Sequence, residues 1–240
     1  MTSNLDPIAL AHEYRLARLR ILDIVEELVS TDPALSLAAV PACPAWTVHD
    51  LVAHVSGIAT EIASNNMPGE DSDAWVDALV ESRRSMSLRD LVDEWTASGP
   101  IFESLAATNK RLAVPLTYDT VVHEHDLRHA VKRAGARDSS GVVAAMHVGV
   151  WLMTNDLKRH DFGAVRFVAG GRAWECGEGD VRLALDLDSE GHRYPVWELL
   201  RLTGSRRSRD QIVAHDWSGN VEEALPALLH MELPLDDLDE

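Results

Sequence analysis

In CPAWTVHDLVAHVSG, residues 43–57, a proline-rich segment leads into an amphipathic helix. Thr47 followed by Asp50 is a capping-box pattern with a shorter carboxylate than usual, and it predicts that the helix starts at Thr47. The apolar stripe of this helix begins at Leu51, and His54 lies at its edge on the same side as Asp50. A histidine at the edge of a buried stripe raises the question of what it binds.

A second stretch, YDTVVHEHDLRHA (residues 118–130), repeats the arrangement of a carboxylate followed four residues later by a histidine. An α-helix advances about 100° per residue, so Asp119 and His123 share the apolar, inward face of this helix. By the same arithmetic His125 and His129 point the opposite way. We expect those two histidines to be solvated, and we give them no role.

Hydrophobic spacing along the chain predicts a mainly α fold in two parts. The pair Gly99-Pro100 is expected to kink or end the helix that begins near residue 87. After His160 the sequence pattern changes, and it predicts a hairpin about Gly170-Gly171, a strand at 181–188 and two short helices. Helices are expected at about 8–30, 47–64, 74–83, 87–99, 117–134 and 141–157. We therefore predict a helical bundle at 1–160 and a small α+β module at 161–240.

Composition excludes several classes of protein. The 240 residues carry 22 Lys+Arg against 39 Asp+Glu, a net charge of −17, which repels nucleic acid despite one basic cluster, GSRRSR, at 204–209. No apolar run approaches the roughly 20 residues of a membrane span, and the N-terminus has no apolar signal core. Cys43 and Cys176 lack motif spacing. We expect a cytoplasmic protein with neither nucleic-acid nor membrane partners.

Two histidines and one carboxylate that share a face have the spacing needed to hold a cation. Such a set leaves coordination positions open, as in a catalytic metal site rather than a closed structural one. A hydrogen-bonded core histidine, or a helix-surface pair, gives the same spacing. The residues alone leave both interpretations open for His54, Asp119 and His123.

Three segments resemble one known family, that of the mycothiol-dependent maleylpyruvate isomerases, whose helical domain is a DinB-like four-helix bundle. They are CPAWTVHDLVAHVSG, DTVVHEHDLRHA and, near the C-terminus, ELLRLTGSRRSRDQIVAHDWSG, which is similar to an appended C-terminal module. The resemblance implies that His54, Asp119 and His123 bind a divalent metal, usually zinc, although His₂-carboxylate sites also accept nickel or iron. The family pattern has glutamate where this chain has Asp119, one methylene shorter.

The resemblance also implies a chemistry, in which a small thiol, mycothiol, acts as co-substrate. A metal at an open position holds the thiol as its thiolate, the nucleophilic form. In isomerisation the thiolate adds to a cis double bond, the intermediate rotates and the thiol leaves; in S-transfer the adduct is released. The small electrophilic substrate can carry a carboxylate, for which Arg206 or Arg207 is the expected catalytic partner, with a solvated basic turn as the alternative.

Two other hypotheses stay open beside this enzyme. The chain is either a non-catalytic metal-binding or sensing module that serves a regulator, or a helical domain that keeps the fold without the metal. We interpret Cys43 as structural, Trp46 as a hydrophobic anchor for the following helix, and Trp151 and Trp197 as core residues. Asp126 is either a hydrogen-bond partner of a ligand histidine or a helix-surface carboxylate, and the surface interpretation is preferred. The sequence does not define the substrate or the oligomeric state.

Overall fold

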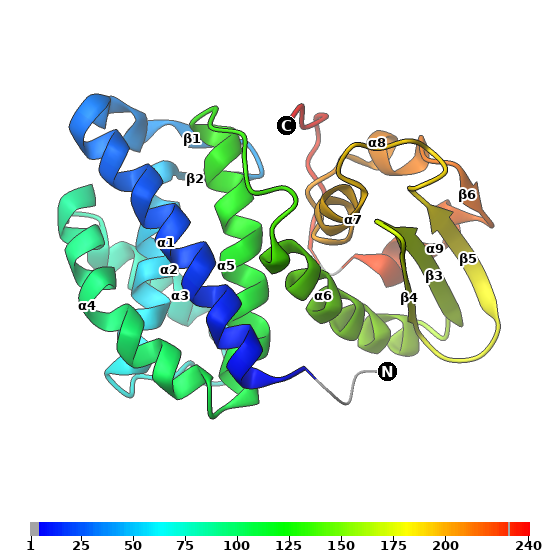
Figure 1. Ribbon diagram of the computed structural model, residues 1–240, viewed down its shortest axis with the longest axis horizontal. Helices are drawn as coiled ribbons and strands as arrows, with labels where there is room; N and C mark the ends of the chain where they lie inside the picture. The colour runs from blue at the N-terminus through cyan, green and yellow to red at the C-terminus, as the bar shows by residue number, and fades with distance from the viewer. Residues whose placement is uncertain (1–4, 230) are drawn as a thin grey trace. The chain divides into compact units, whose positions relative to one another are not determined.

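The computed structural model describes residues 5–229 and 231–240 and is mainly helical with a small sheet part (Figure 1). This confirms the prediction that the fold is mainly α. Its contacts divide the chain into two compact units, Leu5–Gly135 and the described residues from Ala136 onward. Among the described residues, no helix combines the length and the apolar character that a membrane crossing requires.

The first unit, hereafter the helical unit, is built from long helices and one small hairpin. Its elements are α1 (Pro7–Thr31), a 3₁₀ turn (Pro33–Leu37), β1 (Ala39–Val40), β2 (Cys43–Thr47), α2 (Val48–Ala63), α3 (Ser72–Arg83), α4 (Leu88–Ala106) and α5 (Lys110–Ala130). Helix α1 packs on α4 and α5, α2 packs on α4 and α5, and α3 lies beside α2. The antiparallel β1–β2 hairpin lies in the proline-rich segment that leads into α2, and no pattern in the sequence predicted it.

The core of the helical unit joins α1 to α4 and α5 through polar as well as apolar contacts. The indole Nε1 of Trp95 donates to the hydroxyl of Tyr14 at 3.0 Å, and both side chains are buried. The hydroxyl of Thr117 donates to the carbonyl of Leu10 at 3.0 Å. Buried polar groups are costly unless they are paired, so these bonds fix how the helices pack.

The helix caps follow the sequence, whereas one predicted helix end does not. Thr47 with Asp50 and Ser87 with Asp90 both form capping boxes, as the spacing predicts. Helix α4 does not end at Gly99-Pro100 but continues to Ala106 with Pro100 inside it. Proline removes one backbone hydrogen bond, and the buried Phe102 and Ala106 keep the following turn packed.

The second unit, hereafter the C-terminal unit, packs helices on a four-stranded sheet of order β4-β3-β5-β6. Its elements are α6 (Ser140–Arg159), β3 (Ala164–Ala169), β4 (Arg172–Cys176), β5 (Val181–Asp186), α7 (Pro195–Thr203), α8 (Arg209–Val213), β6 (Trp217–Ser218) and α9 (Val221–Leu228). Strands β3 and β5 pair in parallel and the other neighbours are antiparallel. The hairpin predicted about Gly170-Gly171 is present, with both glycines at positive φ, and the carboxylate of Asp188 accepts both of their N–H groups.

Helix α6 belongs to the C-terminal unit, so the division falls after Gly135 rather than at 160. Its apolar side packs on α7, α9 and β4. Trp151, expected in the core, is 38% exposed on this helix, whereas Trp197 is buried as expected.

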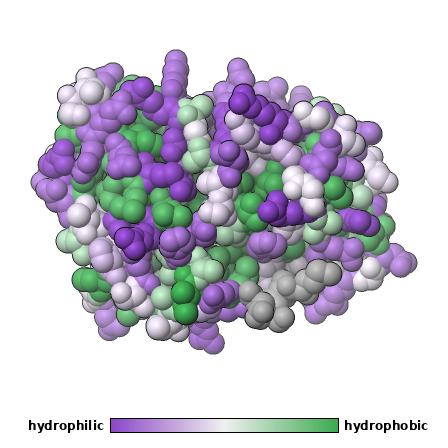
Figure 2. Space-filling view, viewed as in Figure 1, coloured by the Kyte–Doolittle hydropathy of each residue, from purple (hydrophilic) through white to green (hydrophobic). Residues whose placement is uncertain are grey.

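Hydrophilic side chains predominate on the face drawn in Figure 2, with smaller hydrophobic areas between them.

Candidate metal centre

The three predicted ligand residues lie together within the helical unit. His54 comes from α2, and Asp119 and His123 come from α5. Oδ1 of Asp119 is 3.3 Å from Nε2 of His54 and 3.4 Å from Nε2 of His123, and all three donor atoms lie within 4.8 Å of one another. The shorter aspartate therefore reaches both histidines.

These separations match the spacing of ligands around a small cation. In a tetrahedral site with bonds of about 2.1 Å, neighbouring ligand atoms are roughly 3.4 Å apart. A neutral N–H···O hydrogen bond usually has its two heavy atoms closer, at about 2.9–3.0 Å. The donor set and its spacing therefore fit a divalent metal such as zinc.

Asp126 fixes the orientation of one of the two imidazoles. Nδ1 of His123 donates to Oδ2 of Asp126 at 3.0 Å, and Asp126 is fully buried. The preferred interpretation of Asp126 as a surface carboxylate is therefore wrong, because the side chain lies one turn along α5 and turns inward to this imidazole. A ligand histidine commonly donates its second N–H to a carboxylate in this way.

Cys43 reaches the same carboxylate from β2. Its Sγ is 3.8 Å from Oδ2 of Asp126, and the donor atoms of Cys43, His123 and Asp126 also lie within 4.8 Å of one another. This second set uses Nδ1 of His123, the nitrogen that faces away from Asp119. His123 therefore has candidate metal ligands near both of its ring nitrogens. A metal at Nε2 would leave the hydrogen bond from Nδ1 to Asp126 intact, whereas a metal at Nδ1 would break it.

Trp46 covers both histidine rings. Its ring centroid lies 4.8 Å from that of His54 and 5.7 Å from that of His123, and the two imidazoles are 4.9 Å apart. The indole therefore restricts the rotation of both rings and excludes water from that side. The sequence suggested only an anchor for the helix; the alternation of β2 does not show which helix its side chains will meet.

His54, Asp119 and His123 are hereafter called the triad. Their electrostatics favour an ionised carboxylate at Asp119. Burial raises the pKa of Asp119, but the two neighbouring histidines outweigh it and hold this pKa well below its usual range. Burial lowers the pKa of His123, whereas the charge of Asp119 and hydrogen bonds to Asp119 and Asp126 raise it well above the usual range. A cation that binds here would therefore compete with a proton for His123.

The two other histidines of α5 do not behave as predicted. His125 is 3% exposed and His129 is half-buried, so neither is a solvated side chain. Every residue from Thr120 to Leu127 is buried, and Glu124 forms a two-bonded ion pair with Arg20 of α1. Helix α5 packs against α1, α2 and α4 and therefore has more than one buried face. A prediction that assumes a single apolar face misses the others.

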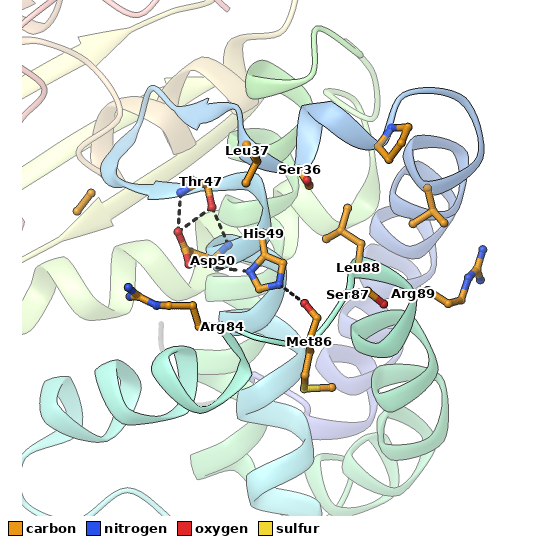
Figure 3. Close-up of a pocket in the computed structure, with 13 residues that line it drawn as sticks. Ser36, Leu37, Thr47, His49, Asp50, Arg84, Met86, Ser87, Leu88 and Arg89 are labelled. Atoms are coloured by element: carbon orange, nitrogen blue, oxygen red, sulfur yellow. Dashed lines mark hydrogen bonds and ion pairs between the residues drawn. The ribbon is translucent and has the colours of Figure 1, made fainter.

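A separate pocket of about 650 Å³ opens beside the start of α2 (Figure 3). His49 donates from Nε2 to the carbonyl of Met86 at 2.8 Å on its wall, and Asp50 lies there bonded to Thr47. Asp50 is therefore used by the helix cap rather than paired with His54. None of the three triad residues lines this pocket.

Arg206 and Arg207 lie in the C-terminal unit and are both buried. Arg207 pairs through two bonds with Glu198, at 2.6 and 2.7 Å, and also with Glu240. Arg206 donates from Nη1 to the carbonyl of Gly204 at 2.8 Å. The segment is therefore not the solvated basic turn that was the alternative, because acidic partners elsewhere in the unit enclose the Arg207 guanidinium.

Comparison with protein-family models, with curated proteins and with solved structures gave no match for this chain.

Proposed function

We propose that the helical unit is a DinB-like bundle that binds a divalent metal, most simply zinc, and uses a low-molecular-weight thiol as co-substrate. The observation that carries this proposal is the position of Asp119 Oδ1 between the Nε2 atoms of His54 and His123. When bound, the metal would hold the thiol as its thiolate, the form that attacks an electrophile. The reaction class is isomerisation or S-transfer, as in the mycothiol-dependent maleylpyruvate isomerases.

The residues around the triad have distinct roles in this proposal. Asp119 and the two imidazoles supply three ligand atoms, which leaves room for one more from a small molecule. Asp126 holds His123 with Nε2 directed at the site, and Trp46 packs on both rings. The side chain of Asp119 is 28% exposed, whereas those of the histidines are nearly buried, so a co-substrate would reach the site past Asp119.

Arg207 is not given a substrate-binding role in this proposal. Its guanidinium is bonded to Glu198 and Glu240, and releasing it would leave the largely buried Glu198 without its guanidinium partner, whereas Glu240 would keep its ion pair with Arg201. The mycothiol-dependent activity is therefore proposed on the triad alone.

The test compares the wild-type chain with His54→Ala, and uses His12→Ala as the matched control. His12 is an exposed histidine of the same unit, so its loss changes composition without touching the triad. We expect His54→Ala to hold one zinc fewer per chain by elemental analysis and to lose turnover of maleylpyruvate with mycothiol. The control should retain both.

Two results would separate the alternatives. A zinc content in His54→Ala equal to that of wild type contradicts the metal centre. If His54→Ala loses zinc but the wild-type protein shows no thiol-dependent turnover, the enzyme is contradicted and the non-catalytic metal-binding module is favoured.

A further inference from the structure

A second cluster of metal-binding side chains lies in the C-terminal unit, at residues to which the sequence reasoning gave no role. Glu190 and His192 come from the connection between β5 and α7, and His215 follows α8. Oε2 of Glu190 is 2.7 Å from Nδ1 of His215 and 2.9 Å from Nε2 of His192, which are hydrogen-bond distances, so both contacts would lengthen to roughly 3.4 Å around a bound cation. The three donor atoms lie within 4.8 Å of one another.

The backbone holds this cluster in place. Gly191, between Glu190 and His192, has a φ of +76°, a conformation that side-chain-bearing residues rarely adopt and that lets the chain turn there. The N–H of Asp216 donates to Oε1 of Glu190 at 2.8 Å, which fixes the carboxylate from its other end. The imidazoles of His192 and His215 lie with ring centroids 5.5 Å apart.

His215 lies between two carboxylates. Its Nδ1 contacts Glu190, and its Nε2 is 3.9 Å from Oε1 of Glu198. A neutral imidazole carries a single N–H and can donate it to only one of them. A cation held by Glu190 and Nδ1 would leave that proton on Nε2, facing Glu198, which is the usual relation of a ligand histidine to a supporting carboxylate.

We propose that Glu190, His192 and His215 bind a divalent transition metal, with zinc as the best match. Two imidazoles and one carboxylate suit zinc better than the hard cations calcium or magnesium, which prefer oxygen ligands. The side chain of His192 is 33% exposed, so the ion can enter from solvent and keep a water ligand. The bound ion would tie the β5–α7 connection to the segment that joins α8 to β6. This proposal does not depend on the function proposed for the triad.

The test is a calorimetric titration of the metal-free, full-length chain with zinc chloride. We expect wild type to bind two equivalents, and His192→Ala and Glu190→Gln to bind one each. His160→Ala is the matched control, because His160 is an exposed histidine of the same unit outside the cluster, and it should bind two. His192 is partly exposed, so its replacement should leave the fold intact, and the melting temperature of each metal-free variant checks this.

The pattern of losses separates this site from the triad. His54→Ala should retain one equivalent, and the double variant of His54 and His192 should bind none. The proposal is overturned if His192→Ala and Glu190→Gln bind as many equivalents as wild type with equal affinity, or if a single wild-type equivalent disappears in His54→Ala. If wild type binds one equivalent of zinc and only His192→Ala loses it, the result supports this site and contradicts a metal at the triad.

Discussion

Replacing Asp126 by asparagine tests how the triad is held. Asparagine has nearly the same shape, and its amide oxygen can still accept the N–H from Nδ1 of His123, but the negative charge is lost. A hydrogen bond to a charged group contributes about 1.5–3 kcal/mol and a neutral one about 0.5–1.5 kcal/mol. The difference, about 1–1.5 kcal/mol, corresponds to a roughly tenfold weaker zinc affinity.

The measurement is a competition titration of metal-free protein against a chromophoric zinc chelator at neutral pH. Asp77→Asn is the matched control, because Asp77 is an exposed aspartate of the same unit and its replacement makes the same change in charge. We expect the control to bind as wild type does. An unchanged affinity in Asp126→Asn would refute the reasoning.

A loss beyond about a thousandfold would also refute it, because changes to supporting groups typically cost only 10–100-fold. Such a loss would make Asp126 a direct ligand, together with Cys43 and Nδ1 of His123. Cys43→Ser would then lower the affinity as well, whereas it should leave a metal on the His54 side in place.

Two further predictions concern the C-terminal unit. A Cβ at Gly177 would lie 2.2 Å from the carbonyl oxygen of Gly163, whereas Gly179 has the same φ of +87° and open space around it. Gly177→Ala should therefore lower the free energy of unfolding in urea by at least about 2 kcal/mol more than Gly179→Ala does. Equal losses in the two variants would contradict the clash. Burial raises the pKa of Glu198, but its bonds to Arg207 and the charge of Arg207 outweigh this and hold it below the ordinary value of 4.5, so its contribution is present above pH 4.5 and is lost as the pH falls below that value. Unfolding free energies measured from pH 7 downward should therefore fall less steeply in Glu198→Gln than in wild type, and parallel slopes would contradict the assignment.

The sequence carried enough information to find the triad. His54, Asp119 and His123 each lie on the apolar side of a helix, and helical periodicity shows this directly. What periodicity leaves out is which element meets that side. The position of Trp46 over both imidazoles depends on the β1–β2 hairpin, whose pairing has no local pattern in a segment rich in prolines.

The same limit explains the errors at α5 and α6. The burial of His125 follows from packing in the folded protein rather than from the helix itself. The hydrophobic spacing of residues 141–157 predicted a helix, but it could not say whether α6 packs on helices or on a sheet. The ion pairs of Arg207 join residues 9 and 33 positions away, a separation at which composition and spacing give no signal.

His54 and Asp119 are 65 residues apart along the chain, and they meet only when α2 has packed against α5. The unfolded chain therefore offers no such site, and any ion bound there is thermodynamically linked to folding. At a free concentration 100 times its dissociation constant, a ligand that binds only the folded state adds about 2.7 kcal/mol to stability. In a cell, the lifetime of the helical unit would then vary with metal supply.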